Sequence, residues 1–126
     1  MTTPLFIFLG AGLGGLLRYG LGTHPQGATA SPFPLGTLVV NVSGCLAIGV
    51  VAALSHPWLQ REDIRLGLIV GVLGGYTTFS TFALESIRML AEGNWGRAAA
   101  YITLSNVLSL LAAWGGMSAV RAISTR

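Results

Sequence analysis

Polar side chains interrupt the apolar segments of this sequence in three places. The densest set is GGYTTFSTF, residues 74–82, which carries five hydroxyl groups between two apolar runs. In an earlier segment Thr37 and Asn41 are four residues apart, so they share one face of a helix. In a later segment three hydroxyls recur every four residues and form one stripe: Tyr101, Ser105 and Ser109. Lipid offers no hydrogen bonds, so aligned polar groups in a membrane span indicate either an ion pathway or a contact with another helix.

The GGYTTFSTF segment is poorly suited to a continuous helix. Gly74 and Gly75 are weak helix formers. The threonines that follow are β-branched, and their hydroxyls compete for backbone hydrogen bonds. We therefore expect a helix break from Gly74 to Thr77, which would free carbonyl groups that are suitable ligands for a small cation. The alternative is a simple kink at the glycine pair, with the carbonyls satisfied by the threonine hydroxyls.

Two aromatic rings follow the predicted break. Phe79 and Phe82 are three residues apart, so they are neighbours on one helical face, with Ser80 and Thr81 between them. An aromatic ring has a positive edge, so rings beside hydroxyls can replace the hydration of an anion without a full positive charge. Two phenylalanines alone are equally typical of an apolar core, and Asn41 alone is equally typical of a hydrogen bond between helices.

The elements that carry these residues are membrane helices. Of the 126 residues, 52% are hydrophobic and only 9% are charged, and the mean hydropathy is +0.71, outside the range of soluble domains. A bilayer core needs roughly 20 helical residues per crossing. Four segments qualify: about Pro4 to Gly22, Leu35 to Leu54, Ile64 to Leu90 and Ala98 to Val120. We predict an all-α integral membrane protein with one domain over residues 1–126, four transmembrane helices, and the third broken near its middle.

The charged residues are few, and they argue against two classes of function. The seven basic residues are scattered arginines, so the net charge of +3 does not predict nucleic-acid binding. No phosphate loop, metal-ligand spacing or nucleophile with a base is present, so we do not expect an enzyme. Inside the spans the ionisable residues are Arg18 and Glu85. We expect structural roles for these two and for Thr37, with Glu85 pairing either with Arg18 or with Arg88.

The distribution of arginines predicts that the chain inserts in both orientations. Four spans place both termini on one side of the membrane. Four arginines lie on that side and three on the other: Arg61, Arg65, Arg121 and Arg126 against Arg18, Arg88 and Arg97. Because this bias is too small to set one orientation, we expect antiparallel pairing of two copies, with a single weakly biased orientation as the alternative. A four-helix chain also leaves little room for a polar pathway in its own centre, so function needs at least a dimer.

Four stretches of the sequence resemble one membrane family. They are GLGGLLRYG (Gly12 to Gly20), PLGTLVVNVSG (Pro34 to Gly44), GGYTTFSTFALES (Gly74 to Ser86) and the Tyr101, Ser105, Ser109 stripe. Together they resemble the Fluc (CrcB) family of small fluoride channels over essentially the full length. The third stretch is highly specific, whereas the first alone is weak. Departures are Tyr76, where the family often has leucine, and Ala83; neither changes an expected role.

The resemblance implies an antiparallel, dual-topology homodimer in the inner (plasma) membrane, with two fluoride pores and a structural sodium ion at the centre of the interface. The sodium ligands would be the backbone carbonyls of Gly74 and Thr77 from both subunits. The fluoride pore would be lined by donors along three segments: Asn41, Phe79, Ser80, Thr81, Phe82, Tyr101, Ser105 and Ser109. Conduction would be passive and fluoride-selective. The expected partners are the fluoride ion, a second copy of the chain and the lipid bilayer, and not nucleic acid.

Two other functions remain as alternatives at this point. A small proton-coupled antiporter, similar to the small multidrug-resistance transporters, also has four short spans and dual topology. Such transporters depend on a buried carboxylate in the first span, which has no acid here, so only Glu85 could serve. A membrane scaffold is the other alternative: the G-x-x-x-G faces at Gly10 and Gly14 and at Gly67 and Gly71 would suffice for it. The aligned polar stripes would then have no explanation.

Overall fold

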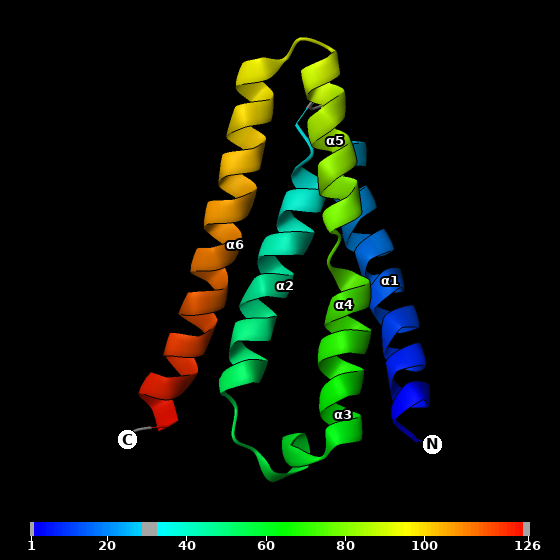
Figure 1. The fold of residues 1–126 in the computed structure, drawn as a ribbon, viewed down its shortest axis with the longest axis vertical. Helices are drawn as coiled ribbons and strands as arrows, with labels where there is room; N and C mark the ends of the chain where they lie inside the picture. The colour runs from blue at the N-terminus through cyan, green and yellow to red at the C-terminus, as the bar shows by residue number, and fades with distance from the viewer. Residues whose placement is uncertain (1, 29–32, 125–126) are drawn as a thin grey trace.

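The structure is a computed structural model that describes residues 2–28 and 33–124, and all regular secondary structure in these ranges is helical (Figure 1). The elements in chain order are α1 Thr2–Ala28, α2 Leu35–Ala53, a 3₁₀ turn Pro57–Gln60, α3 Glu62–Leu66, a π-helical stretch Gly67–Leu73, α4 Gly74–Tyr76, α5 Phe79–Ala91 and α6 Trp95–Ser124. The expected all-α class is confirmed. Arg126, which the charge count above includes, lies outside the described residues.

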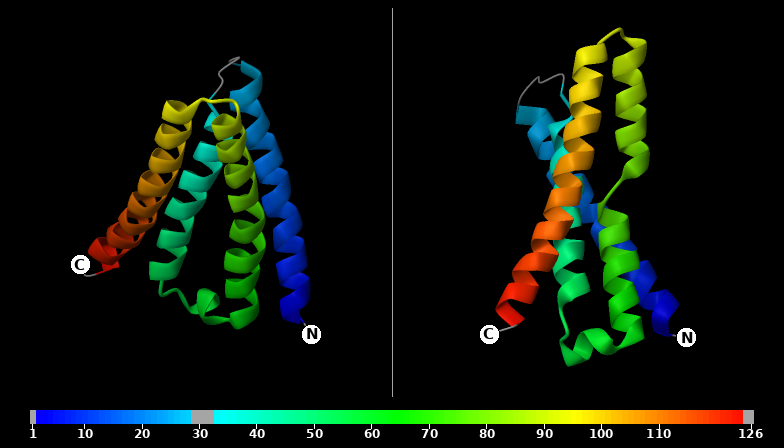
Figure 2. Two further views of the ribbon diagram at one scale, coloured as in Figure 1. Left: turned by 45° about the horizontal axis from the view of Figure 1, so that its top comes forward. Right: turned by 60° about the vertical axis from the view of Figure 1, so that its left-hand side comes forward.

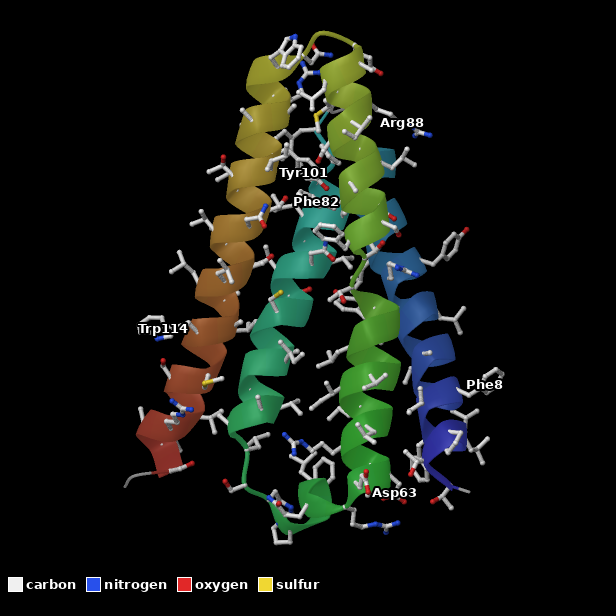
Figure 3. All side chains as sticks on the ribbon, viewed as in Figure 1. Phe8, Asp63, Phe82, Arg88, Tyr101 and Trp114 are labelled. Carbon is white, nitrogen blue, oxygen red and sulfur yellow. The ribbon has the colours of Figure 1, made fainter. Side chains whose placement is uncertain are left out.

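Four stretches are long and apolar enough to cross a bilayer: Thr2–Gly22, Leu35–Ala53, Glu62–Ala91 and Trp95–Ser124. They match the four expected segments to within a few residues at each end. The last one starts three residues before the expected Ala98, because the Ala98 N–H donates to the Asn94 carbonyl (2.9 Å) and closes an earlier first turn. Large apolar side chains such as Phe8 and Trp114 point outward from the bundle (Figure 3), as expected for residues that face lipid.

Both ends of the described chain lie at one end of the bundle, together with the connection from α2 to α3 (Figure 1). The tight turn between α5 and α6 lies at the opposite end (Figure 2). Gly93 makes that turn with a φ of +78°, a conformation that glycine adopts without steric cost. The N–H groups of Gly93 and Asn94 then close onto carbonyls of Leu90 (3.1 Å) and Met89 (2.8 Å), which end α5.

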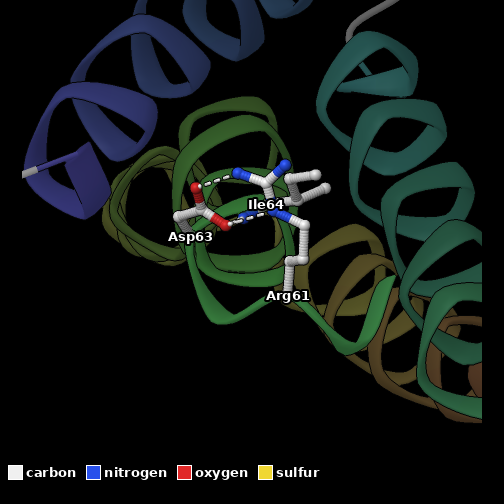
Figure 4. Close-up of polar contacts among 3 residues, drawn as sticks. All are labelled: Arg61, Asp63 and Ile64. Carbon is white, nitrogen blue, oxygen red and sulfur yellow. Dashed lines mark hydrogen bonds and ion pairs between the residues drawn. The ribbon is translucent and has the colours of Figure 1, made fainter. Parts of the chain in front are cut away.

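The connection into α3 carries the one ion pair found among the described residues. Arg61 contacts Asp63 through Nη2 and Oδ2 at 2.8 Å, and the Asp63 Oδ1 accepts the Ile64 N–H at 3.0 Å (Figure 4). Acidic side chains suit the first turn of a helix, where N–H groups are free. Arg61 is largely exposed, so this pair contributes little to stability and serves mainly to start α3.

Glycines set the distance between α1 and the segment that runs from Gly67 into α4. A Cβ at Gly10 would overlap the Gly67 carbonyl oxygen, and a Cβ at Gly71 would lie 3.1 Å from the Gly10 Cα. The two G-x-x-x-G faces of the sequence therefore pack against each other inside one chain, backbone against backbone. Gly49 and Gly116 do the same for α2 and α6, since a Cβ on either would overlap a backbone carbonyl of the other helix.

The core of the bundle lies toward the α5–α6 turn. Phe82, Met89, Ala98 and Tyr101 form a buried cluster there (Figure 3), and Phe33 and Leu38 pack against it. Tyr101 is fully buried, and its ring meets Phe33 edge-on with centroids 5.5 Å apart. Aromatic and aliphatic packing thus ties α5 and α6 to α2 and leaves the polar residues nearer the middle of the bundle.

The backbone departs from helix at two residues between α4 and α5. Thr77 has ψ of 156°, and Thr78 has φ of −147° and ψ of 109°, so both are extended. Gly74 and Gly75, which were expected to be part of the irregular region, are helical. The glycine pair serves a different purpose: a Cβ at Gly75 would overlap the backbone of Ala11 in α1. Gly75 is a poor helix former, but its lack of a side chain lets α4 pack closely against α1.

We predict that Gly14→Ala weakens the bundle and that Gly12→Ala does not. A Cβ at Gly14 would overlap the Val72 carbonyl and lie 2.8 Å from the Tyr76 backbone nitrogen, whereas a Cβ at Gly12 meets nothing within 4 Å. Forcing the helices apart costs about 1–3 kcal/mol, and a glycine in an open helical position gains up to about 1 kcal/mol on becoming alanine. Thermal unfolding of the purified variants measures both. Equal unfolding midpoints would show that α1 does not approach this segment closely.

Candidate functional site

Most of the predicted site residues surround one cavity between α2, the α4–α5 junction and α6. Its volume is about 380 Å³, and its other walls are chiefly apolar side chains of α2, α6 and the Gly67–Leu73 stretch. The predicted residues that line it are Asn41, Gly74, Thr77, Phe79, Phe82, Ser105 and Ser109. Residues from three separate segments thus meet at one place, as an ion pathway requires and as the linear sequence could not establish.

Ser105 is the clearest polar group in this cavity. Its side chain is only 6% exposed, and its Oγ is the one buried side-chain N or O atom without a hydrogen bond partner among the described residues. Burying a hydroxyl without a partner costs free energy. An unsatisfied hydroxyl at the wall of a cavity indicates that water or another small hydrogen-bonding species belongs there.

A second cavity, of about 340 Å³, lies on the other side of the extended residues. Arg18, Thr37 and Thr81 line it. Thr78 borders both cavities. Arg18 lies level with this junction, since its Nη1 donates to the Thr77 carbonyl at 3.3 Å. The Arg18 guanidinium is thus directed at the junction and not at Glu85, its expected partner.

Asn41 holds the junction by pairing with the backbone of Thr78 in both directions. The Asn41 Oδ1 accepts the Thr78 N–H at 2.8 Å, and the Asn41 Nδ2 donates to the Thr78 carbonyl at 3.0 Å. The Asn41 carboxamide thus makes the two hydrogen bonds to Thr78 that a neighbouring β-strand would make in a sheet. Its Nδ2 carries a second N–H, which has no hydrogen bond acceptor within the described part of the chain and remains available at the cavity wall.

Thr78 was not among the predicted site residues, yet its side chain organises the start of α5. Its Oγ1 accepts the Thr81 N–H at 3.2 Å and donates to the Thr81 Oγ1 at 3.0 Å. The Ser80 Oγ lies 3.3 Å from the same oxygen. A threonine directly before a new helix is a preferred N-cap, so the sequence contained a signal for this role. The hydroxyls of Ser80 and Thr81, predicted as pore donors, belong to this capping group and lie on exposed residues.

The two carbonyls expected to bind a cation are among the four, from Gly74 to Thr77, that have no helical donor where the backbone is extended. In a continuous helix the Gly74 carbonyl would accept from the Thr78 N–H, which here donates to Asn41. The Thr77 carbonyl would accept from the Thr81 N–H, which here donates to the Thr78 side chain. Only the long contact from Arg18 reaches the Thr77 oxygen. Both oxygens are thus chemically suited to a hard cation, which prefers oxygen ligands.

Glu85 makes neither of the ion pairs that the sequence indicated. Its Oε1 accepts from the Thr37 hydroxyl at 2.9 Å and its Oε2 accepts from the Tyr101 hydroxyl at 2.7 Å. Arg18 lies at the Thr77 carbonyl, and Arg88 points outward (Figure 3), so both predicted pairs are wrong. The structural roles expected of Thr37 and Glu85 stay predictions, and the structure adds that these two side chains contact each other. Glu85 is thus bonded by two neutral hydroxyls in place of an arginine, because Thr37 and Tyr101 lie on the helices that face it.

The contact between Tyr101 and Glu85 separates Tyr101 from the other two residues of the hydroxyl stripe predicted on α6. Tyr101 is fully buried, donates to Glu85 and packs against Phe82, with ring centroids 5.3 Å apart. Ser105 and Ser109 line the 380 Å³ cavity instead. Tyr101 therefore stands at the cavity end nearest the α5–α6 turn and is not one of the residues lining it.

Phe79 and Phe82 lie side by side, with ring centroids 5.4 Å apart. Both line the cavity, but their surroundings differ: Phe82 is 9% exposed, and Phe79 is 77% exposed. The pair is expected as a functional unit, yet within one chain only Phe82 is enclosed. A ring as exposed as Phe79 contributes to an enclosed site only where something else covers it.

Comparison with known proteins decides the family. Residues 5–117 match the family described as CrcB-like protein, Camphor Resistance (CrcB). The chain belongs to this family. It is 43% identical to a protein named "Fluoride-specific ion channel FluC" from Chloroflexus aurantiacus over 113 residues, 89% of this chain and 90% of that one. A protein of the same name from Rhizobium meliloti is 42% identical over 124 residues, 98% of this chain and 99% of that one. One from Solibacter usitatus is 46% identical over 113 residues, 89% and 93% of the two chains.

We predict that Asn41→Leu destabilises the protein far more than Asn106→Leu. The first change leaves the N–H and the carbonyl of Thr78 without partners in an apolar environment, and each costs about 1–3 kcal/mol. Asn106 is exposed and only donates to the Ile102 carbonyl of its own helix, so its loss costs little. Unfolding midpoints of the two variants measure the difference. Similar midpoints would mean that the Thr78 backbone does not depend on Asn41.

Proposed function

We propose that this protein is a fluoride channel that releases fluoride from the cell by passive conduction. Its membership of the CrcB-like family, whose relatives above carry the name fluoride-specific ion channel, supports this function. The single structural observation that carries it is the 380 Å³ cavity, where neutral donors from α2 and α6 meet two aromatic rings from α5. The same relatives favour a channel over the proton-coupled antiporter and over an enzyme.

Fluoride holds its water tightly, so a pore must replace that water with several donors in sequence, none strong enough to trap the ion. Candidate donors in the cavity are the second N–H of Asn41 and the hydroxyls of Ser105 and Ser109. The ring edges of Phe79 and Phe82 add weak positive potential. Ions would pass from the cavity beside Arg18 and Thr81, around Thr78 and the nearby Ser80 hydroxyl, and along this row toward Tyr101.

The functional unit in this proposal is an antiparallel homodimer with two pores. Phe79, Ser80 and Thr81 are exposed on the single chain although they carry predicted pore roles, and a second copy would cover them. The described arginines near the helix ends are nearly balanced, with Arg61, Arg65 and Arg121 at one end and Arg88 and Arg97 at the other. A near balance allows insertion in both orientations, which an antiparallel pair needs. The expected location is the inner membrane.

In the same proposal the third membrane span is broken at Thr77 and Thr78, and a structural sodium ion binds at the break. The Gly74 and Thr77 carbonyls lack their helical donors and would hold the cation. Two oxygens are few for a small cation, so a second copy related by a two-fold axis would double the ligand set. A bound cation would stabilise irregular backbone that lipid could not satisfy.

The proposed function is tested by ion efflux from liposomes that contain the purified protein. Fluoride should leave much faster than chloride, and without a proton gradient, because the donors fit a small anion and no carboxylate lines the 380 Å³ cavity. A chloride-selective electrode and a fluoride-selective electrode measure the two rates. If chloride leaves as fast as fluoride, or if fluoride flux requires a pH difference, the channel proposal is wrong.

A matched pair of variants tests the phenylalanine rings. Phe79→Ile should lower fluoride flux on the order of tenfold or more, since losing an interaction of about 1.4 kcal/mol at the barrier changes a rate tenfold. Phe8→Ile is the control, because Phe8 is equally exposed, at 74% against 77%, and lies on the outer face of α1. Flux per dimer is the readout, with the dimer checked by size-exclusion chromatography. Unchanged flux in Phe79→Ile would remove this ring from the pathway.

A further inference from the structure

Tyr76 is a buried polar residue that the proposed pathway does not use. It is the last residue of α4, directly before the extended Thr77, and only 9% of it is exposed. Its ring lies over Gly44 of α2, where a Cβ would be 3.2 Å from the Tyr76 Cδ1 and would overlap the Thr77 Cγ2. Because Gly44 has no side chain, the end of α4 can pack directly against α2 at this position.

The Tyr76 hydroxyl lies 2.8 Å from the Ser43 Oγ, and the direction of this hydrogen bond follows from counting protons. Ser43 has one hydroxyl proton. Its Oγ lies 2.7 Å from the Val39 carbonyl and 3.1 Å from the Val40 carbonyl, so that proton is directed to its own helix. Tyr76 must then be the donor and Ser43 the acceptor. Removing the tyrosine hydroxyl leaves Ser43 satisfied, whereas removing the serine leaves a buried tyrosine O–H without an acceptor.

Two contacts to α2 thus enclose Thr77. Tyr76, on one side of it, is held by Ser43, and Thr78, on the other side, is held by Asn41. Ser43 and Asn41 are two residues apart on α2, so both contacts start from one rigid element. The carbonyl of Thr77 cannot rotate or shift without loss of one of them. The carbonyl of Gly74, one turn earlier on α4, moves with Tyr76.

We propose that Tyr76, through its hydrogen bond to Ser43, is a positioning residue for the cation held by the Gly74 and Thr77 carbonyls. This inference rests on the sodium site of the proposed function and deepens it. Tyr76 does not touch the cation. It restricts the two oxygens to a separation that suits a small cation, because a fixed cage selects by size more sharply than a flexible one.

The test compares stabilisation by sodium in the full-length protein. Thermal unfolding midpoints are measured over a range of sodium chloride concentrations, with N-methylglucamine chloride added to keep ionic strength constant. The wild type, Tyr76→Phe, Ser43→Ala and the double variant are compared. Ser124→Ala is the matched control, because this exposed serine donates to a carbonyl of its own helix, as Ser43 does, but has no tyrosine partner. The same titration with lithium and potassium gives the selectivity.

Tyr76→Phe should raise the sodium concentration that gives half of the stabilisation by about two- to tenfold, the factor that one neutral hydrogen bond is worth. It should also reduce the preference for sodium over potassium. Ser43→Ala should have the larger effect, since it leaves the buried O–H of Tyr76 unsatisfied. The double variant should match Tyr76→Phe alone, because Ser43 makes no bond to residue 76 once the tyrosine hydroxyl is gone. Ser124→Ala should behave as the wild type.

The possible failures are distinguishable. If the half-point for sodium is the same in Tyr76→Phe and the wild type while only the midpoint without sodium falls, Tyr76 is merely structural and the inference is wrong. If the wild type itself shows no sodium dependence, the inference fails with the sodium site, while fluoride efflux from liposomes decides the channel function separately. If Ser43→Ala does not assemble, the comparison of Tyr76→Phe and the double variant with the wild type carries the test.

Discussion

The pairing of Asn41 with both backbone groups of Thr78 is the interaction on which the centre of this structure depends. An extended residue inside a lipid bilayer exposes an N–H and a carbonyl that nothing in lipid can satisfy. Asn41 satisfies both, at 2.8 and 3.0 Å. The chain can therefore leave the helix at Thr77 and Thr78 and resume it at Phe79. The same pairing draws the Thr78 N–H away from the Gly74 carbonyl, so one side chain both permits the break and exposes an oxygen that the helix would have used.

Close packing of the helices around this junction fixes their heights relative to one another. Glycines allow α1 to touch the segment that leads to α4, and a second set allows α2 to touch α6. Close backbone contact fixes the heights of the helices more firmly than long side chains would. As a result α2, which carries Asn41, and α6, which carries Ser105 and Ser109, present polar groups to one cavity. Arg18 reaches the junction from α1, and Glu85 closes the polar row through Thr37 and Tyr101.

Particular residues show how far sequence reasoning reached. The spacing of apolar segments predicted the four span-capable helices. Polar spacing, the two phenylalanine rings and the family resemblance singled out Asn41, Phe79, Phe82, Ser105 and Ser109, which the fold places around one cavity. The ion pairs predicted for Glu85 were wrong, because charge complementarity in a sequence does not state which groups lie nearer. Thr78 was missed as an organiser, although its position before a helix is a recognised capping signal. Tyr76 had no predicted role, since its partner Ser43 lies on another helix.

The sequence by itself determined that this is a membrane protein of four helices, because hydropathy and length are properties of the chain alone. It also determined which polar groups are available and, through its motifs, the family. Only the tertiary structure decided how those groups are used. Whether a hydroxyl is free at a cavity, as in Ser105, or bonded to a carboxylate, as in Tyr101, depends on which helices meet at that height. Which helices meet is set by backbone contacts at glycines, and these contacts join residues that are far apart in the chain.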